Sequence, residues 1–157
     1  MDIKDALKRI KARRIDTLHQ VDTYYHCSQG RLKVREINRE QYELIFYQRP
    51  DISRSRISRY DVLPIQKRQL RLIKDLLQDA FGRRVVVKKI REFWLYKHTR
   101  VLLDEVLGLG KFLELETVCK GINVDKAKIE QRTVVDLLKL NNLRKLGKSY
   151  ADMLIKI

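Results

Sequence analysis

Residues 112–116 read FLELE, and this alternation of apolar and acidic side chains indicates a β-strand with two unlike faces. Because successive side chains of a strand point to opposite faces, Glu114 and Glu116 would share one face, and Leu113 and Leu115 the other. The stretch therefore predicts a half-buried strand that sets two carboxylates side by side. In a strongly basic chain, these carboxylates raise the question of what they bind.

Cations occupy the polar faces of other alternating stretches. Residues 31–35, RLKVR, place Arg31, Lys33 and Arg35 on one face. The corresponding faces of later strands carry Arg49, Lys89, Arg91, Arg100 and Asp104. On a single strand this pattern is typical of a solvated face. Solvated faces usually mix charge signs, however, whereas these strands separate cations from carboxylates, which favours a binding surface.

The hydrophobic pattern between these stretches predicts the remaining elements. Apolar residues at helical spacing indicate helices over 3–10, 125–143 and 149–157, and a further helix that Pro64 opens and Gly82 ends. Strands are expected over 20–27, 31–37, 42–49, 57–62, 84–96, 99–106 and 110–119. Helices with one apolar stripe need an apolar sheet face to cover. We therefore expect one α+β domain over residues 1–157, built on an antiparallel sheet.

A sheet of this many strands can curl so that its polar face lines a channel. Such a lining of cations and carboxylates needs a compensating ligand, and a polyphosphate with a divalent metal compensates both. Arginine grips phosphate oxygens in pairs, while carboxylates hold Mg²⁺ together with phosphate oxygens. The predicted phosphate contacts are Arg31, Lys33, Arg35, Arg49, Lys89, Arg91 and Arg100. The predicted metal ligands are Asp104, Glu114 and Glu116, and the pattern assigns no catalytic residue.

Composition fits an anionic partner without identifying it. The 157 residues hold 35 Lys and Arg against 20 Asp and Glu, a net charge of +15. Nucleic acid, a phosphorylated small molecule and an acidic membrane all suit such a charge. Cys27 and Cys119 have no disulfide or zinc spacing, and we find no signal peptide or membrane span, so we expect a cytoplasmic protein that does not bind membranes. The basic first helix keeps a nucleic-acid partner open as a less favoured alternative.

Six stretches together carry a family resemblance. They are QVDTYY, GRLKVRE, YQRPD, VVVKKIRE, RVLLDEV and GLGKFLELE, in this order along nearly the whole chain. In order and spacing they resemble the CYTH superfamily of triphosphate tunnels, above all its class IV adenylate cyclase-like members and its thiamine triphosphatases. The resemblance implies an eight-stranded antiparallel barrel with helices outside, which binds a triphosphate through the basic positions and Mg²⁺ or Mn²⁺ through the acidic ones. It implies ATP, thiamine triphosphate or inorganic tripolyphosphate as ligand, and cyclase-like or triphosphatase-like activity.

The sequence departs from the family at one motif. The ExExK motif of the family's first strand is absent before the first helix, and Leu102 stands where cyclase-like members often have histidine. We therefore expect a barrel short of one strand, with an unpaired edge able to contact another chain, such as a second copy in a homodimer. Two hypotheses stay open. We expect either a truncated form of a longer metal-dependent enzyme, active if the complete chain carries ExExK, or a catalytically inactive module that binds polyphosphate or RNA.

Overall fold

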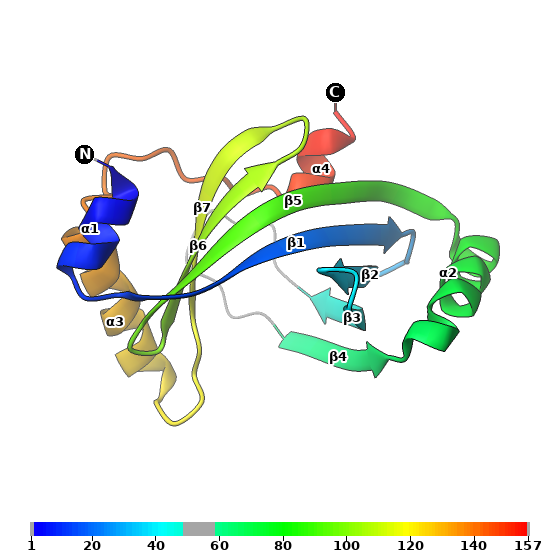
Figure 1. Ribbon diagram of the computed structural model, residues 1–157, viewed down its shortest axis with the longest axis horizontal. Helices are drawn as coiled ribbons and strands as arrows, with labels where there is room; N and C mark the ends of the chain where they lie inside the picture. The colour runs from blue at the N-terminus through cyan, green and yellow to red at the C-terminus, as the bar shows by residue number, and fades with distance from the viewer. Residues whose placement is uncertain (1, 49–58, 157) are drawn as a thin grey trace. The chain divides into compact units, whose positions relative to one another are not determined.

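The computed structural model describes residues 2–48 and 59–156, which contain seven strands and four helices. The strands are β1 (Arg13–Tyr25), β2 (Arg31–Ile37), β3 (Gln41–Gln48), β4 (Arg59–Ile65), β5 (Arg83–Tyr96), β6 (Thr99–Val106) and β7 (Gly110–Thr117). The helices are α1 (Ile3–Arg9), α2 (Lys67–Phe81), α3 (Val124–Leu137) and α4 (Tyr150–Leu154) (Figure 1). Within this part of the chain, no helix is both long and apolar enough to cross a membrane.

The strands form one sheet in the order β4-β3-β2-β1-β5-β6-β7. Neighbouring strands β1 to β4 run antiparallel, as the sequence predicts. Among the described residues, β4 and β7 are the two ends of this order, so the sheet is not closed by hydrogen bonds. The predicted α+β class and antiparallel sheet are confirmed.

The chain divides into two compact units, and each is described by itself. Unit 1 comprises Met1–Leu18, Arg91–Glu105 and Lys111–Lys145. Unit 2 comprises His19–Ile90, Val106–Gly110 and Leu146–Ile157.

The core of unit 1 lies between its strands and helices α1 and α3. Leu7, Val101 and Val134 are fully buried there, and Trp94 is 4% exposed. Leu113 and Leu115 pack against this core, on the face of β7 opposite to the two glutamates. The stretch 112–116 is therefore a strand with one apolar and one acidic face, as predicted.

The core of unit 2 lies between its sheet and helix α2. Leu70, Ile73 and Leu77 of the helix pack against a buried cluster of strand residues. This cluster consists of Tyr25, Val34, Tyr42 and Ile65. The helix ends at Gly82, whose φ of 75° is a conformation that glycine adopts without steric cost. Because α2 covers the face of Val34, the cations of β2 are on the opposite face of the sheet.

Two expectations about the bounds of elements are wrong in detail. Pro64 does not open the helix but lies inside β4, and α2 begins at Lys67. β4 ends the strand order, a position where a proline that lacks an N–H is tolerated. The first strand begins at Arg13 rather than at residue 20.

Candidate functional site

Unit 2 contains a basic cluster centred on the polar face of β2. Lys33 donates from Nζ to Asp22 Oδ2 at 2.8 Å. Arg35 donates from Nε and NH2 to the two oxygens of Asp22, each at 2.8 Å. The strand register explains the contact, because Asp22 of β1 is directly opposite Arg35. One carboxylate, 1% exposed, thus holds two cations.

The protonation of Asp22 is fixed by these neighbours. Burial raises the pKa of its carboxyl, but the charges of Lys33 and Arg35 and the hydrogen bond from Arg35 outweigh burial. The pKa is therefore held well below its usual range. Asp22 is therefore ionised at neutral pH.

Two tyrosines complete the surroundings of Lys33. Its Nζ lies 5.2 Å from the ring centroid of Tyr24 and 5.4 Å from that of Tyr47, within the range of cation–π contacts. The two hydroxyls are 3.4 Å apart, and Lys33 Nζ donates to that of Tyr24 at 3.3 Å. Burial raises the pKa of Tyr47 above its ordinary value, so its hydroxyl remains protonated. Lys33 is thereby oriented by groups that leave its charge in place.

Helix α4 adds a second carboxylate to the basic cluster. Asp152 accepts from Arg31 NH2 at 2.7 Å and from Arg84 NH2 at 3.1 Å. The same aspartate closes a capping box with Ser149 at the start of the helix. Tyr150, the next residue after that cap, has its ring centroid 5.1 Å from Lys89 Nζ. The C-terminal helix therefore contacts three cations of unit 2.

Positive charge exceeds negative charge in this cluster. The cations are Arg31, Lys33, Arg35, Arg84 and Lys89, and the carboxylates are Asp22, Asp152 and Glu43, which stands opposite Arg35 on β3. Arg31, Lys33 and Lys89 are each less than a tenth exposed. Gln20, on the same face of β1 as Asp22, has a buried Oε1 without a hydrogen-bond partner among the described residues. Buried surplus charge and an unpaired acceptor both indicate a surface arranged to meet a ligand.

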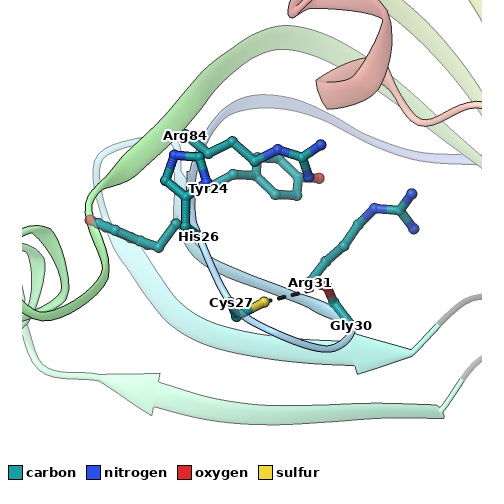
Figure 2. A pocket seen from close by; sticks show the side chains of 7 residues that line it. Tyr24, His26, Cys27, Gly30, Arg31 and Arg84 are labelled. Carbon is teal, nitrogen blue, oxygen red and sulfur yellow. Dashed lines mark hydrogen bonds between the residues drawn. The ribbon is translucent and has the colours of Figure 1, made fainter.

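A pocket of about 330 Å³ opens beside the basic cluster at the turn between β1 and β2. Its lining includes Tyr24, His26, Cys27, Arg31 and Arg84. In Figure 2, Tyr24 and His26 lie on the side of Arg84, while Cys27 lies at the turn near Arg31. Cys27 is a free thiol and donates from Sγ to the carbonyl of Gly30 at 3.3 Å. The pocket thus combines two guanidinium groups with aromatic rings.

Unit 1 contains an acidic cluster, and a single arginine dominates it. Arg91 donates to both oxygens of Asp104, at 2.7 and 2.6 Å, and to Glu114 at 2.8 Å. Burial lowers the pKa of Arg91, but the two carboxylates outweigh burial and raise it, so the guanidinium stays charged. Glu116 lies 3.8 Å from Arg100, and both side chains are nearly half exposed. Carboxylates are thus in excess over cations in this cluster.

The acidic cluster does not suit a metal ion held by side chains alone. The described residues contain no group of three His, Cys, Asp or Glu placed to hold a metal. Asp104 is 2% exposed and gives both oxygens to Arg91. Glu114 and Glu116 keep oxygens outside close ion pairs, which suits Mg²⁺ that arrives with phosphate, because this ion needs only one or two carboxylates when phosphates supply other ligands.

The structure brings the predicted site residues together in two groups. Arg31, Lys33, Arg35 and Lys89 belong to the basic cluster of unit 2, and Arg91, Arg100, Asp104, Glu114 and Glu116 belong to unit 1. Arg49 lies outside the described residues. The sequence analysis missed Asp22, although the alternation in QVDTYY places it on one face with Tyr24. It also missed Asp152, which no strand pattern could have connected with Arg31.

Comparisons with known proteins support the fold. A family model described as the CYTH domain matches residues 1–150. The PH1012 protein from Pyrococcus horikoshii shares 23% identity over 96% of this chain and 90% of its own, with a TM-score of 0.81. A proposed adenylate cyclase from Vibrio parahaemolyticus shares 19% identity over 97% and 89%, with a TM-score of 0.75.

A third similar structure is the Pct1 RNA triphosphatase from S. pombe, in complex with the Spt5 CTD. It shares 15% identity over 94% of this chain and 64% of its own, with a TM-score of 0.56. A search of curated protein sequences found no match.

Proposed function

The chain belongs to the CYTH domain family, and on that premise we propose that it binds a triphosphate together with a divalent metal ion. The observation that supports this most is the buried surplus of positive charge in unit 2. Arg31, Lys33 and Lys89 are nearly inaccessible to water, and the described residues of the basic cluster comprise five cations and three carboxylates. A polyphosphate would supply the missing negative charge, through paired hydrogen bonds with Arg31 and Arg35 and a point contact with Lys33.

The pocket at the β1–β2 turn suits the organic part of such a ligand. It lies beside Arg31 and offers the rings of Tyr24 and His26. Aromatic side chains stack on nucleotide bases and similar rings. ATP and thiamine triphosphate are therefore our proposed ligands, with inorganic tripolyphosphate as the ligand that would leave this pocket empty.

In unit 1 the proposal rests on the family pattern and on that unit's own contacts. Arg91 and Arg100, and Arg49 beyond the described residues, are proposed as further phosphate contacts. Glu114 and Glu116 are proposed as ligands of Mg²⁺ or Mn²⁺ that enters with the triphosphate, where the ion would neutralise phosphate charge. Asp104 was predicted as a third metal ligand, and we propose instead that it orients Arg91, because both of its oxygens accept from that side chain.

A second function, binding of a polyanion without catalysis, has support from the contact of Arg91 with Asp104 and Glu114. Because these two carboxylates are engaged by Arg91 rather than by a metal ion, the chain would hold a polyanion without metal and without turnover. Enzyme and binder differ in two measurements. An enzyme releases phosphate or cyclic nucleotide from the triphosphate in the presence of Mg²⁺ or Mn²⁺, whereas a binder forms no product and binds equally well in EDTA.

Thermal unfolding with tripolyphosphate tests the shared step. A ligand that binds only the folded chain raises its melting temperature, so tripolyphosphate should do so and inorganic phosphate much less. Arg35→Gln should weaken the shift, whereas Arg132→Gln, the same change at an exposed site on α3, should leave it intact. If tripolyphosphate gives no shift, or if both variants behave alike, the proposed function is wrong.

The metal step needs its own variant. Glu114→Gln combined with Glu116→Gln should abolish any additional shift that Mg²⁺ gives in the presence of tripolyphosphate, while the shift from tripolyphosphate alone persists. If the additional shift survives in this variant, these two glutamates do not bind the metal.

A further inference from the structure

Helix α2 has an outer face that the core of unit 2 does not use. The residues that pack on the sheet are Leu70, Ile73 and Leu77. The flank of the helix beside Ile73, turned away from the sheet, carries Leu72 and Leu76, which are 62% and 58% exposed. Figure 1 shows that α2 has strands on one side only. Two large leucines one helical turn apart on an open face form a continuous apolar seam.

Charged residues flank this seam in a polarised order. Lys67, Arg68 and Arg71 occupy the N-terminal half of α2, and Asp75 and Asp79 occupy the C-terminal half. Arg68, Leu72, Asp75 and Asp79 follow spacings of four, three and four residues, so they form one stripe along the outer face. All four are exposed. The stripe is basic at one end, acidic at the other and apolar between them.

This order opposes the dipole of the helix. Acidic residues stabilise a helix near its N-terminus and basic residues near its C-terminus. Helix α2 has no acidic residue in its first turn and no basic residue in its last. Within the helix Arg71 Nε lies 3.8 Å from Asp75 Oδ2, but both side chains are largely exposed, so this ion pair offsets little of the cost, which favours a gain elsewhere. An antiparallel partner helix of the same sequence supplies one, because it sets opposite charges beside each other at both ends.

We propose that the outer face of α2 is a docking surface for the α2 helix of a second copy of this chain. With the second helix antiparallel, Arg68 and Arg71 lie near the acidic end of the other copy, and Leu72 and Leu76 meet the same seam. Contacts across a two-fold axis are made twice, so a self-complementary stripe is what a symmetric dimer requires. The exposed Leu63, on the α2 side of β4, enlarges the apolar area.

The expected dimer is weak and depends on concentration. A helix of 15 residues is about 22 Å long, which limits the area it can bury. Interfaces below about 1,200 Å² are typical of transient complexes. The proposal does not involve the basic cluster, so it stands or falls independently of triphosphate binding.

Charge reversal gives the decisive test, measured by sedimentation of the full chain over a wide concentration range. Arg68→Glu with Arg71→Glu should weaken self-association about tenfold or more, because like charges then face each other. Asp75→Lys with Asp79→Lys should do the same. An equimolar mixture of the two variants should associate again, and one chain carrying all four changes should form the homodimer.

The seam has a matched control. Leu72→Ser with Leu76→Ser should weaken association, whereas Ile129→Ser on α3, where the isoleucine is 63% exposed, should not. Circular dichroism verifies that each variant is folded. A wild-type chain that stays monomeric at the highest concentration overturns the proposal. The proposal is also overturned if these changes leave the strength of self-association unchanged, or if the mixed variants fail to associate.

Discussion

The basic cluster of unit 2 and the acidic cluster of unit 1 have the same strand construction but an excess of opposite charge. In each, charged residues alternate with core residues along antiparallel strands. In unit 2 one buried carboxylate, Asp22, holds two cations. In unit 1 one buried cation, Arg91, holds two carboxylates.

The difference indicates which ligand each cluster can accept. A buried ion is tolerated only when opposite charge and hydrogen bonds compensate it. Among the described residues, five cations accompany three carboxylates in unit 2, which fits our proposal of phosphate binding, while three carboxylates accompany two cations in unit 1, which fits our proposal of a metal ion that enters with phosphate. Each cluster also has one central charged side chain, and its removal should lower the stability of the fold. The following variants test this.

The largest effect is expected from Asp22→Asn. The variant keeps the shape of the side chain but removes the buried carboxylate that accepts hydrogen bonds from Lys33 and Arg35. Breaking a buried pair in this way costs about 3–5 kcal/mol of unfolding free energy. Urea unfolding measures it, and Asp136→Asn at an exposed site on α3 is the control. A loss below about 1 kcal/mol would mean that Asp22 does not anchor the cluster.

A similar or somewhat smaller loss, about 3 kcal/mol, is expected from Arg91→Met, because Glu114 is partly solvated and only Asp104 is fully buried. Freed of the guanidinium, Asp104 and Glu114 should then bind Mn²⁺ without any triphosphate. Manganese titration followed by melting temperature checks this, with Arg132→Met at an exposed site on α3 as the control. If Mn²⁺ stabilises the wild type equally well, Arg91 does not block metal binding.

The smallest expected effect concerns how the free energy of unfolding depends on pH through Asp22. The folded-state pKa of Asp22 lies below its unfolded value of about 3.9, so its stabilisation is present above pH 4 and is lost as the pH falls further. Between pH 7 and pH 3, the stability difference between wild type and Asp22→Asn should shrink by about 1 kcal/mol. Unfolding titrations at both pH values measure this. A difference that grows on acidification would contradict the assigned pKa shift.

Strand alternation predicted most of the strands and which of the predicted charged residues share a face. The period-2 pattern placed Glu114 with Glu116, and Arg31 with Lys33 and Arg35, on the polar faces where the structure has them. This works because a side chain's face depends on parity alone. The same reasoning put Leu113 and Leu115 in the core.

Pairings between distant residues could not be predicted in this way. Parity does not say which strand lies opposite, so the contact of Asp22 with Arg35 needed the register of β1 and β2. The contact of Asp152 with Arg31 joins residues 121 positions apart, and only tertiary structure supplies it.

The only tryptophan of the chain, Trp94, lies in the core of unit 1, whereas six of the seven tyrosines belong to unit 2. Its indole emission is therefore a built-in optical probe of one unit alone. Unfolding followed by tryptophan fluorescence and by far-ultraviolet dichroism would coincide for a cooperative chain and separate for units that melt one after the other. Without any label, the native sequence thus allows the cooperativity of its two halves to be read directly.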